Sequence, residues 1–105
     1  MMKHHKDLTP EKWASFPRKD QILNIGSEVS RAQNWRELND REKAEECIER
    51  ALELLDLTLQ DKRWSDNLDD LLRIREGLGA LYAPGSMPII HKFFLDWLTD
   101  FAGKN

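Results

Sequence analysis

Apolar residues recur along most of this 105-residue chain with the three- and four-residue spacing that is typical of amphipathic helices. The spacing predicts four long helices, over about residues 18–37, 41–60, 66–82 and 87–102. The second helix has the clearest apolar stripe, formed by Ala44, Cys47, Ile48, Ala51, Leu52, Leu55 and Leu59. No segment alternates apolar and polar residues with the two-residue period of a strand. We therefore predict an all-α fold, either an antiparallel helical bundle or stacked helical hairpins.

Helix-start signals precede several of these segments. Thr9 followed by Pro10 predicts a short N-terminal helix that ends before Pro17. Asp40 is expected to cap the second long helix, Ser65 or Asp66 the third, and Ser86 the fourth. The short helix and the four long helices are expected to form a single domain over residues 9–105, after a flexible tail over residues 1–8.

Two glycines interrupt the third long helix, at Gly77 and Gly79. Glycine lowers helix stability by about 1 kcal/mol relative to alanine, so its presence there needs a reason. We expect these glycines to permit the close approach of another helix.

The charge distribution argues against a nucleic-acid-binding function. The formal net charge is −3, and residues 40–70 carry eleven acidic side chains against five basic ones. Phosphate backbones are recognised by basic surfaces, which the middle of this chain does not offer. We therefore expect no nucleic-acid partner.

The single cysteine, Cys47, excludes an intramolecular disulfide, and its place on an apolar stripe predicts a buried thiol in a reducing compartment. Residues 1–7 are charged and contain no apolar signal-peptide core, and no apolar run is long enough to span a membrane. These features predict a cytoplasmic protein that has no membrane partner.

The first two long helices resemble one tetratricopeptide-repeat hairpin, over about residues 22–55. The resemblance is carried by a small residue and an aromatic on the first helix and by a small–large–small set on the second: Ala32 and Trp35, then Ala44, Ile48 and Ala51. The chain departs from the repeat at Glu28 and Arg31, where the family has a large aromatic and a leucine, and at Asp56, where the family has a proline. The last two helices do not repeat the pattern. The resemblance implies a scaffold that binds proteins or peptides and has no catalytic activity.

No arrangement of catalytic or metal-binding residues is visible in the sequence. The Glu-x-x-His pair of helical-bundle metal sites is missing, and so is a glycine-rich phosphate loop. We therefore predict no catalytic residue, cofactor or metal. Four charged residues are candidates for a polar patch that recognises a partner, or else for ordinary surface ion pairs: Glu28, Arg31, Arg73 and Glu76.

The last helix carries more apolar side chains than one inner face of a four-helix domain can bury. We predict that the surplus forms an interface for self-association or for a protein partner, with Ile89, Phe93, Phe94, Trp97 and Phe101 as its residues. The alternative is that this helix is the central one and is enclosed by the others.

The function predicted from these patterns is a non-catalytic protein-interaction module or accessory subunit. The alternative class is an enzyme or enzyme subunit with a polar site between helices, for which a small bacterial toxin–antitoxin-type component is one example.

Overall fold

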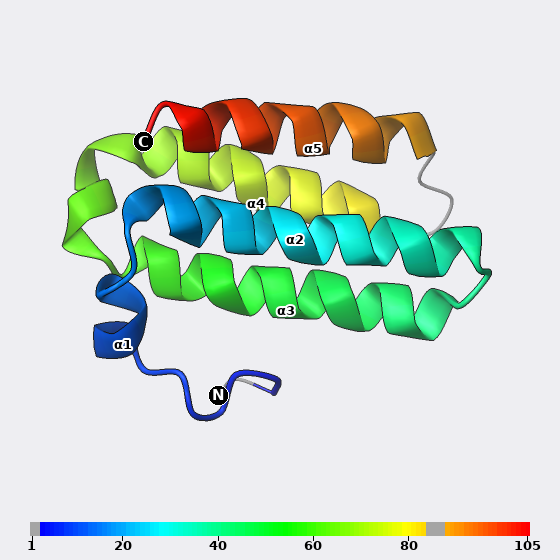
Figure 1. Cartoon of the computed structure of the whole chain (residues 1–105), viewed down its shortest axis with the longest axis horizontal. Helices are drawn as coiled ribbons and strands as arrows, with labels where there is room; N and C mark the ends of the chain where they lie inside the picture. The colour runs from blue at the N-terminus through cyan, green and yellow to red at the C-terminus, as the bar shows by residue number, and fades with distance from the viewer. Residues whose placement is uncertain (1–2, 84–87) are drawn as a thin grey trace.

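The computed structural model describes residues 3–83 and 88–105, except for the side chains of Pro88 and Ile89. Every regular element in these residues is helical, so the predicted all-α fold is confirmed (Figure 1). The elements are α1 (Pro10–Ala14), α2 (Arg18–Glu37), α3 (Arg41–Leu59), the 3₁₀ helix η1 (Lys62–Asn67), α4 (Leu68–Tyr82) and α5 (Pro88–Gly103).

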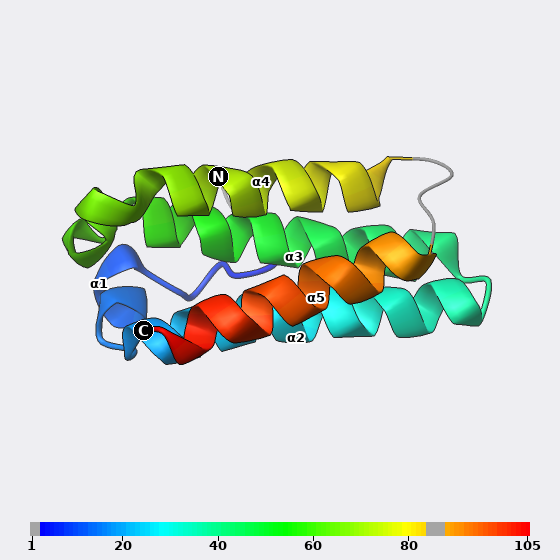
Figure 2. The same cartoon turned by 90° about the horizontal axis from the view of Figure 1, so that it is seen from above.

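The four long helices run alternately up and down and form an antiparallel bundle. The helix α2 packs against both α3 and α5, whereas α4 packs mainly against α3 and meets α5 at few points. As a result, α2 and α4 lie at opposite corners of the bundle, as the view from above shows (Figure 2). The loose junction between α4 and α5 creates the groove described below.

Capping side chains set the starts of α1 and α3 as predicted. The hydroxyl of Thr9 accepts a hydrogen bond from the Lys12 amide at 3.1 Å, and the carboxylate of Asp40 accepts one from the Lys43 amide at 3.1 Å. Between α2 and α3, Asn39 adopts a left-handed backbone conformation with φ of 60°. Asparagine tolerates this conformation better than most residues, which permits a tight turn there.

The predicted start of the third long helix is wrong. Neither Ser65 nor Asp66 caps it, because residues 62–67 form η1 and α4 begins only at Leu68. The cause is Trp64, whose fully buried ring draws this segment against the core before α4 starts. Asp61 caps η1 by accepting a hydrogen bond from the Arg63 amide at 3.0 Å. The predicted cap at Ser86 lies outside the described residues.

A buried amide at Gln21 joins the segments at one end of the bundle. Its Nε2 donates to the carbonyl of Trp13 at 2.8 Å and to Oδ2 of Asp61 at 3.1 Å, and its Oε1 accepts from Nε1 of Trp64 at 2.6 Å. Both polar atoms of the Gln21 amide therefore have hydrogen-bond partners, as buried polar groups usually do. The amide fixes α1 and η1 against α2.

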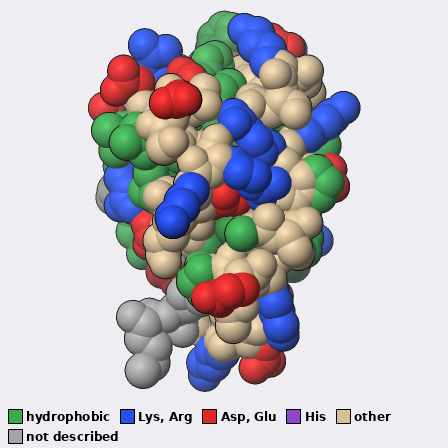
Figure 3. All heavy atoms as spheres, turned by 90° about the vertical axis from the view of Figure 1, so that its left-hand side faces the viewer, with side chains coloured by type: hydrophobic (Ala, Val, Ile, Leu, Met, Phe, Trp, Pro, Cys, Tyr) green, Lys and Arg blue, Asp and Glu red, His purple; other side chains and the backbone are tan. Residues whose placement is uncertain are grey.

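The Asp61–Arg63 ion pair completes this network. The guanidinium of Arg63 donates to both oxygens of the Asp61 carboxylate, with a shortest distance of 2.7 Å. Arg18 lies at the same end, where its guanidinium donates to the carbonyl of Arg63 at 2.7 Å and covers the Trp64 ring at 4.0 Å from the ring centroid. Lysine and arginine side chains gather on this end of the molecule (Figure 3).

The N-terminal residues lie along α3. The main-chain amides of Lys3, His4 and His5 all donate to the carboxylate of Glu53, at 2.8–3.1 Å. His4 Nε2 lies 3.1 Å from an oxygen of Glu49, and this hydrogen bond lowers the pKa of that carboxyl. The mobility predicted for residues 1–8 stays a prediction; the structure adds that Glu53 binds the main chain of residues 3–5.

Prediction for Asp61. Hydrogen bonds from Arg63 lower the pKa of Asp61 from 3.8 to about 2. A carboxyl group with a lowered pKa in the folded state stabilises the fold above its ordinary pKa and loses this contribution as the pH falls through the folded-state value. We expect Asp61→Asn to be less stable than the native chain at about pH 5, and the difference to shrink between about pH 4 and pH 2. Urea unfolding followed by circular dichroism measures both chains, and a difference that is constant with pH would contradict the assignment.

Candidate functional site

A groove of about 360 Å³ lies between α4 and α5, where the two helices meet at few points. One wall comes from the end of η1 and the first half of α4, and the other comes from the last turns of α5 and the C-terminal residues. Its lining residues are Asn67, Asp70, Arg73, Trp97, Asp100, Phe101, Lys104 and Asn105.

The two aromatic residues that line the groove, Trp97 and Phe101, are part of a column of aromatic rings. Trp97 stacks nearly parallel on Phe94 and on Phe101, with ring centroids 6.4 Å and 5.4 Å apart and an interplanar angle of 9° in both pairs. Phe101 continues the column to the buried Trp64, at 5.8 Å between centroids. Offset ring pairs at these separations are favourable beyond the apolar area that they bury. The column therefore fixes the ring of Trp97 as a rigid apolar surface in the groove.

The apolar surface of the groove continues along α5 toward its N-terminus. Ile90, Phe93, Phe94 and Trp97, which we name the aromatic strip, are spaced three and four residues apart and so share one flank of the helix. The side chain of Phe93 is 65% exposed and that of Ile90 is 41% exposed, whereas Phe94 and Trp97 are half-buried. The strip is thus an apolar surface that the bundle covers only in part, with Phe93 and Ile90 as its exposed residues.

The structure brings together four of the five predicted interface residues. Phe93, Phe94 and Trp97 belong to the aromatic strip, and Phe101 lies beneath it, only 8% exposed, as part of the groove floor. The side chain of Ile89 lies outside the described residues. The helix α5 is therefore neither enclosed by the other helices nor fully outward-facing, because one flank is buried and the adjacent flank is exposed.

Four charged side chains surround the aromatic floor of the groove. Asp70 and Arg73 form a 3.7 Å ion pair on α4. Asp100 and Lys104 form the opposite rim, and neither has an ion-pair partner among the described residues. The rim carries two acidic and two basic groups, so its net charge is zero.

The four residues of the predicted polar patch do not come together. Glu28 and Arg31 form a 2.7 Å ion pair on α2, whereas Arg73 and Glu76 are on α4, at the opposite corner of the bundle. Arg73 lines the groove and Glu76 is exposed on α4. Glu28 is 4% exposed, and its Oε2 is buried without a hydrogen-bond partner.

Residues of the proposed repeat hairpin pack between α2 and α3. These residues are fully buried, as expected at a close helix–helix contact: Ala32, Ala44, Ile48 and Ala51. The cation that covers the Trp35 ring is Lys43, whose Nζ lies 4.4 Å from the ring centroid. Arg31 pairs with Glu28.

Sequence reasoning named Arg73 but missed the other three charged residues of the rim, Asp70, Asp100 and Lys104, and also the tryptophan that anchors the aromatic column, Trp64. Asp100 and Lys104 are four residues apart, on the same flank as Trp97, so their spacing carried a usable signal. Trp64 lies in a stretch without helical period, so its burial has no signal in the sequence pattern. The predicted burial of Cys47 is confirmed, since the residue is 1% exposed and unoxidised.

The groove has a mainly polar and charged lining around the two aromatic rings of Trp97 and Phe101, which suits the binding of an apolar side chain flanked by polar or charged groups. Within residues 3–83 and 88–105, no three His, Cys, Asp or Glu side chains are grouped as metal ligands would be. None of the helices described combines the length and apolar composition needed to cross a bilayer. Comparisons with protein-family models, with curated proteins and with solved structures give no significant match.

Prediction for the glycines of α4. A methyl group added to Gly77 would overlap the ring of Phe94, whereas a methyl group at Gly79 would meet no atom within 4 Å. The predicted close approach therefore occurs at Gly77 and not at Gly79. We expect Gly77→Ala to destabilise the fold by about 1–3 kcal/mol, because Phe94 must leave its position against α4. Gly79→Ala is the matched control, and we expect it to stabilise the helix by up to about 1 kcal/mol.

Urea unfolding followed by circular dichroism measures both glycine variants against the native chain. A Gly77→Ala variant that is as stable as Gly79→Ala would contradict the packing of Phe94 on the backbone of α4.

Proposed function

We propose that this chain is a non-catalytic protein-interaction module that self-associates through the groove between α4 and α5. The observation that carries the proposal is the aromatic strip of α5, which is continuous with the groove and includes a phenylalanine, Phe93, that is 65% exposed. Aromatic residues are enriched in protein–protein interfaces, and contiguous exposed apolar surface is typical of a binding site.

The apolar side chains of the strip support an association of useful strength. Covering a large apolar side chain that was exposed contributes about 1.5–3 kcal/mol. A symmetric dimer buries the same residues from both copies. Each copy contributes Phe93, Ile90 and the exposed part of Trp97. This contribution must exceed the cost of lost translational and rotational freedom on association. The stacked rings of Trp97 and Phe101 are already ordered, which lowers that cost.

The charged rim favours a second copy as the partner. A symmetric dimer places the same patch on both sides of its interface, so a rim of one charge sign would repel itself. Here Asp70 and Asp100 are balanced by Arg73 and Lys104. The unpaired Asp100 and Lys104 of one copy are therefore available for ion pairs with the opposite charges of the other.

Two further parts of the proposal rest on the sequence patterns. The buried, unpaired Cys47 favours a reducing compartment, which supports a cytoplasmic location. The tetratricopeptide-like hairpin over about residues 22–55 supports a scaffold role, because that family binds proteins and peptides.

Prediction for Phe93. We expect the native chain at tens of micromolar to have twice the mass of the 12.4 kDa monomer, and Phe93→Glu to weaken the dimer at least about tenfold. A carboxylate at this position would be desolvated in the interface but harmless in the monomer, because the side chain is exposed. Light scattering over a dilution series measures the masses, and circular dichroism checks the fold.

The matched control is Leu72→Glu. Leu72 on α4 is also exposed, at 48%, and lies three residues before Arg75, which pairs with Asp56 of α3, so it lies on a flank away from α5. We expect this variant to keep the dimer. A native chain that is monomeric at every concentration, or a Phe93→Glu variant as dimeric as Leu72→Glu, would contradict the proposal.

A further inference from the structure

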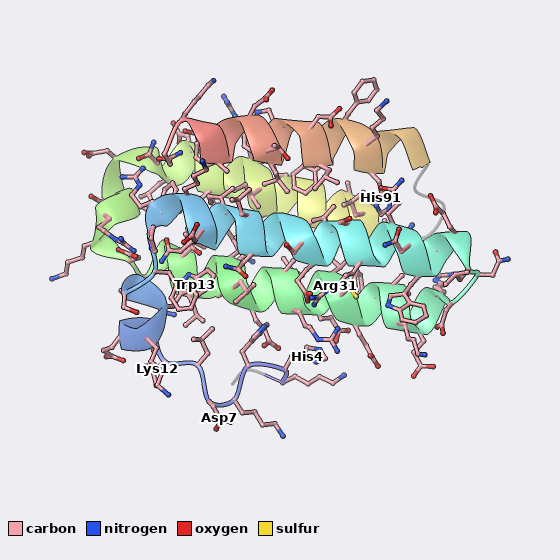
Figure 4. The ribbon with its side chains drawn as sticks, in the orientation of Figure 1. His4, Asp7, Lys12, Trp13, Arg31 and His91 are labelled. Atoms are coloured by element: carbon pink, nitrogen blue, oxygen red, sulfur yellow. The ribbon has the colours of Figure 1, made fainter. Side chains whose placement is uncertain are left out.

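The imidazole of His91 is buried without a hydrogen bond. His91 lies on the inner side of α5, is 1% exposed, and neither of its ring nitrogens has a partner (Figure 4). Buried polar side chains almost always have at least one hydrogen-bond partner. The buried amide of Gln21 has such partners, whereas the His91 ring has none. An unpaired buried imidazole therefore calls for a physical explanation.

The surroundings of His91 disfavour its charged form. The charged group that acts on the ring is Arg36 of α2, whose guanidinium donates to the carbonyl of Leu81 at the end of α4. Arg41 and Glu45 of α3 act in turn on Arg36. Among the described residues, no carboxylate is placed to stabilise an imidazolium at this position. Burial and the positive charge of Arg36 both lower the pKa of His91.

We propose that His91 is an acid-sensitive switch for the docking of α5: a proton on its ring cannot be kept beside Arg36 in the core, so acidification releases the N-terminal half of α5 from α2. The geometry that supports this inference is a fully buried ring whose two nitrogens have no hydrogen-bond partner, and the positive charge of Arg36 adds to it. The helix α5 packs mainly on one neighbour, α2, and contacts α4 at few points. It can therefore separate from α2 while the rest of the bundle stays folded.

The pH window follows from the sign of the linkage. An unfolded or undocked histidine takes up a proton near pH 6.5, whereas the buried ring does so only at lower pH. The docked state is therefore favoured fully above about pH 6.5 and becomes less favoured as the pH falls below it. If the buried ring stays neutral, the equilibrium constant for release rises about tenfold between pH 7.5 and pH 5.5.

The switch would also control the docking surface, because α5 carries the aromatic strip and one wall of the groove. This consequence rests on the proposed function. The acid-sensitive release of α5 does not, since it depends only on contacts within one chain.

The experiment compares the full native chain with His91→Leu and His91→Gln by amide hydrogen exchange at about pH 7.5 and pH 5.5, corrected for intrinsic exchange rates. In the native chain we expect the opening equilibrium of the α5 amides to rise about tenfold at the lower pH, and that of the α3 amides to change less. Neither variant can carry a charge at position 91. We therefore expect each variant that folds to lose the pH dependence of α5 opening.

The matched control is a His4→Gln, His5→Gln double variant, in which the other two histidines of the chain are removed. These two rings lie beside Glu49 and Glu53 of α3, and we expect the double variant to keep the α5 response. The inference is overturned if native α5 shows no rise, if α5 and α3 open equally, or if the His91 variants respond as the native chain does.

Light scattering at the same two pH values separates this inference from the proposed function. A chain that is monomeric at both pH values contradicts self-association but leaves the exchange result to decide on His91. If the chain is dimeric at pH 7.5 but hydrogen exchange of α5 does not respond to acid, self-association is supported and the His91 switch is overturned.

Discussion

Each helix of a four-helix bundle has one inner face, and α5 carries more apolar surface than one face can bury. The structure resolves this constraint by packing α5 along α2 and letting it meet α4 at few points. One of these is the ring of Phe94 against the backbone at Gly77, which a side chain at that position would block. The junction elsewhere stays open, so the groove and the exposed flank of α5 both follow from how this one helix is placed.

The two ends of the bundle differ in how they satisfy buried polar groups. At one end Gln21 links Trp13, Asp61 and Trp64, and this network anchors the aromatic column that stiffens the groove. At the other end Arg36 bonds to the carbonyl of Leu81, while His91 beside it has no partner. The Gln21 network fixes the shape of the groove, and we infer that the unpartnered His91 ring makes the position of α5 sensitive to acid.

Helical periodicity was enough to locate α2, α3 and α5 to within a residue or two and to place Cys47 in the core. It did not reveal η1, because Trp64 enters the core from a segment with no apolar period. Periodicity also assigns a face to each helix without saying which helices are neighbours. For this reason Glu28 and Arg73 could be grouped from the sequence although their helices occupy opposite corners. The missing partners of His91 are a property of the packed core and have no sequence signal.

The central proposal is that two copies of the chain associate through the aromatic strip and the groove between α4 and α5. It is tested most directly by isotope-filtered nuclear Overhauser measurements on a mixture of labelled and unlabelled chains, which report only contacts between copies. The account predicts intermolecular signals between Phe93 or Ile90 and groove residues such as Trp97 and Arg73. Intermolecular signals confined to other faces of the bundle, or none at a concentration where the protein is dimeric by mass, would contradict it.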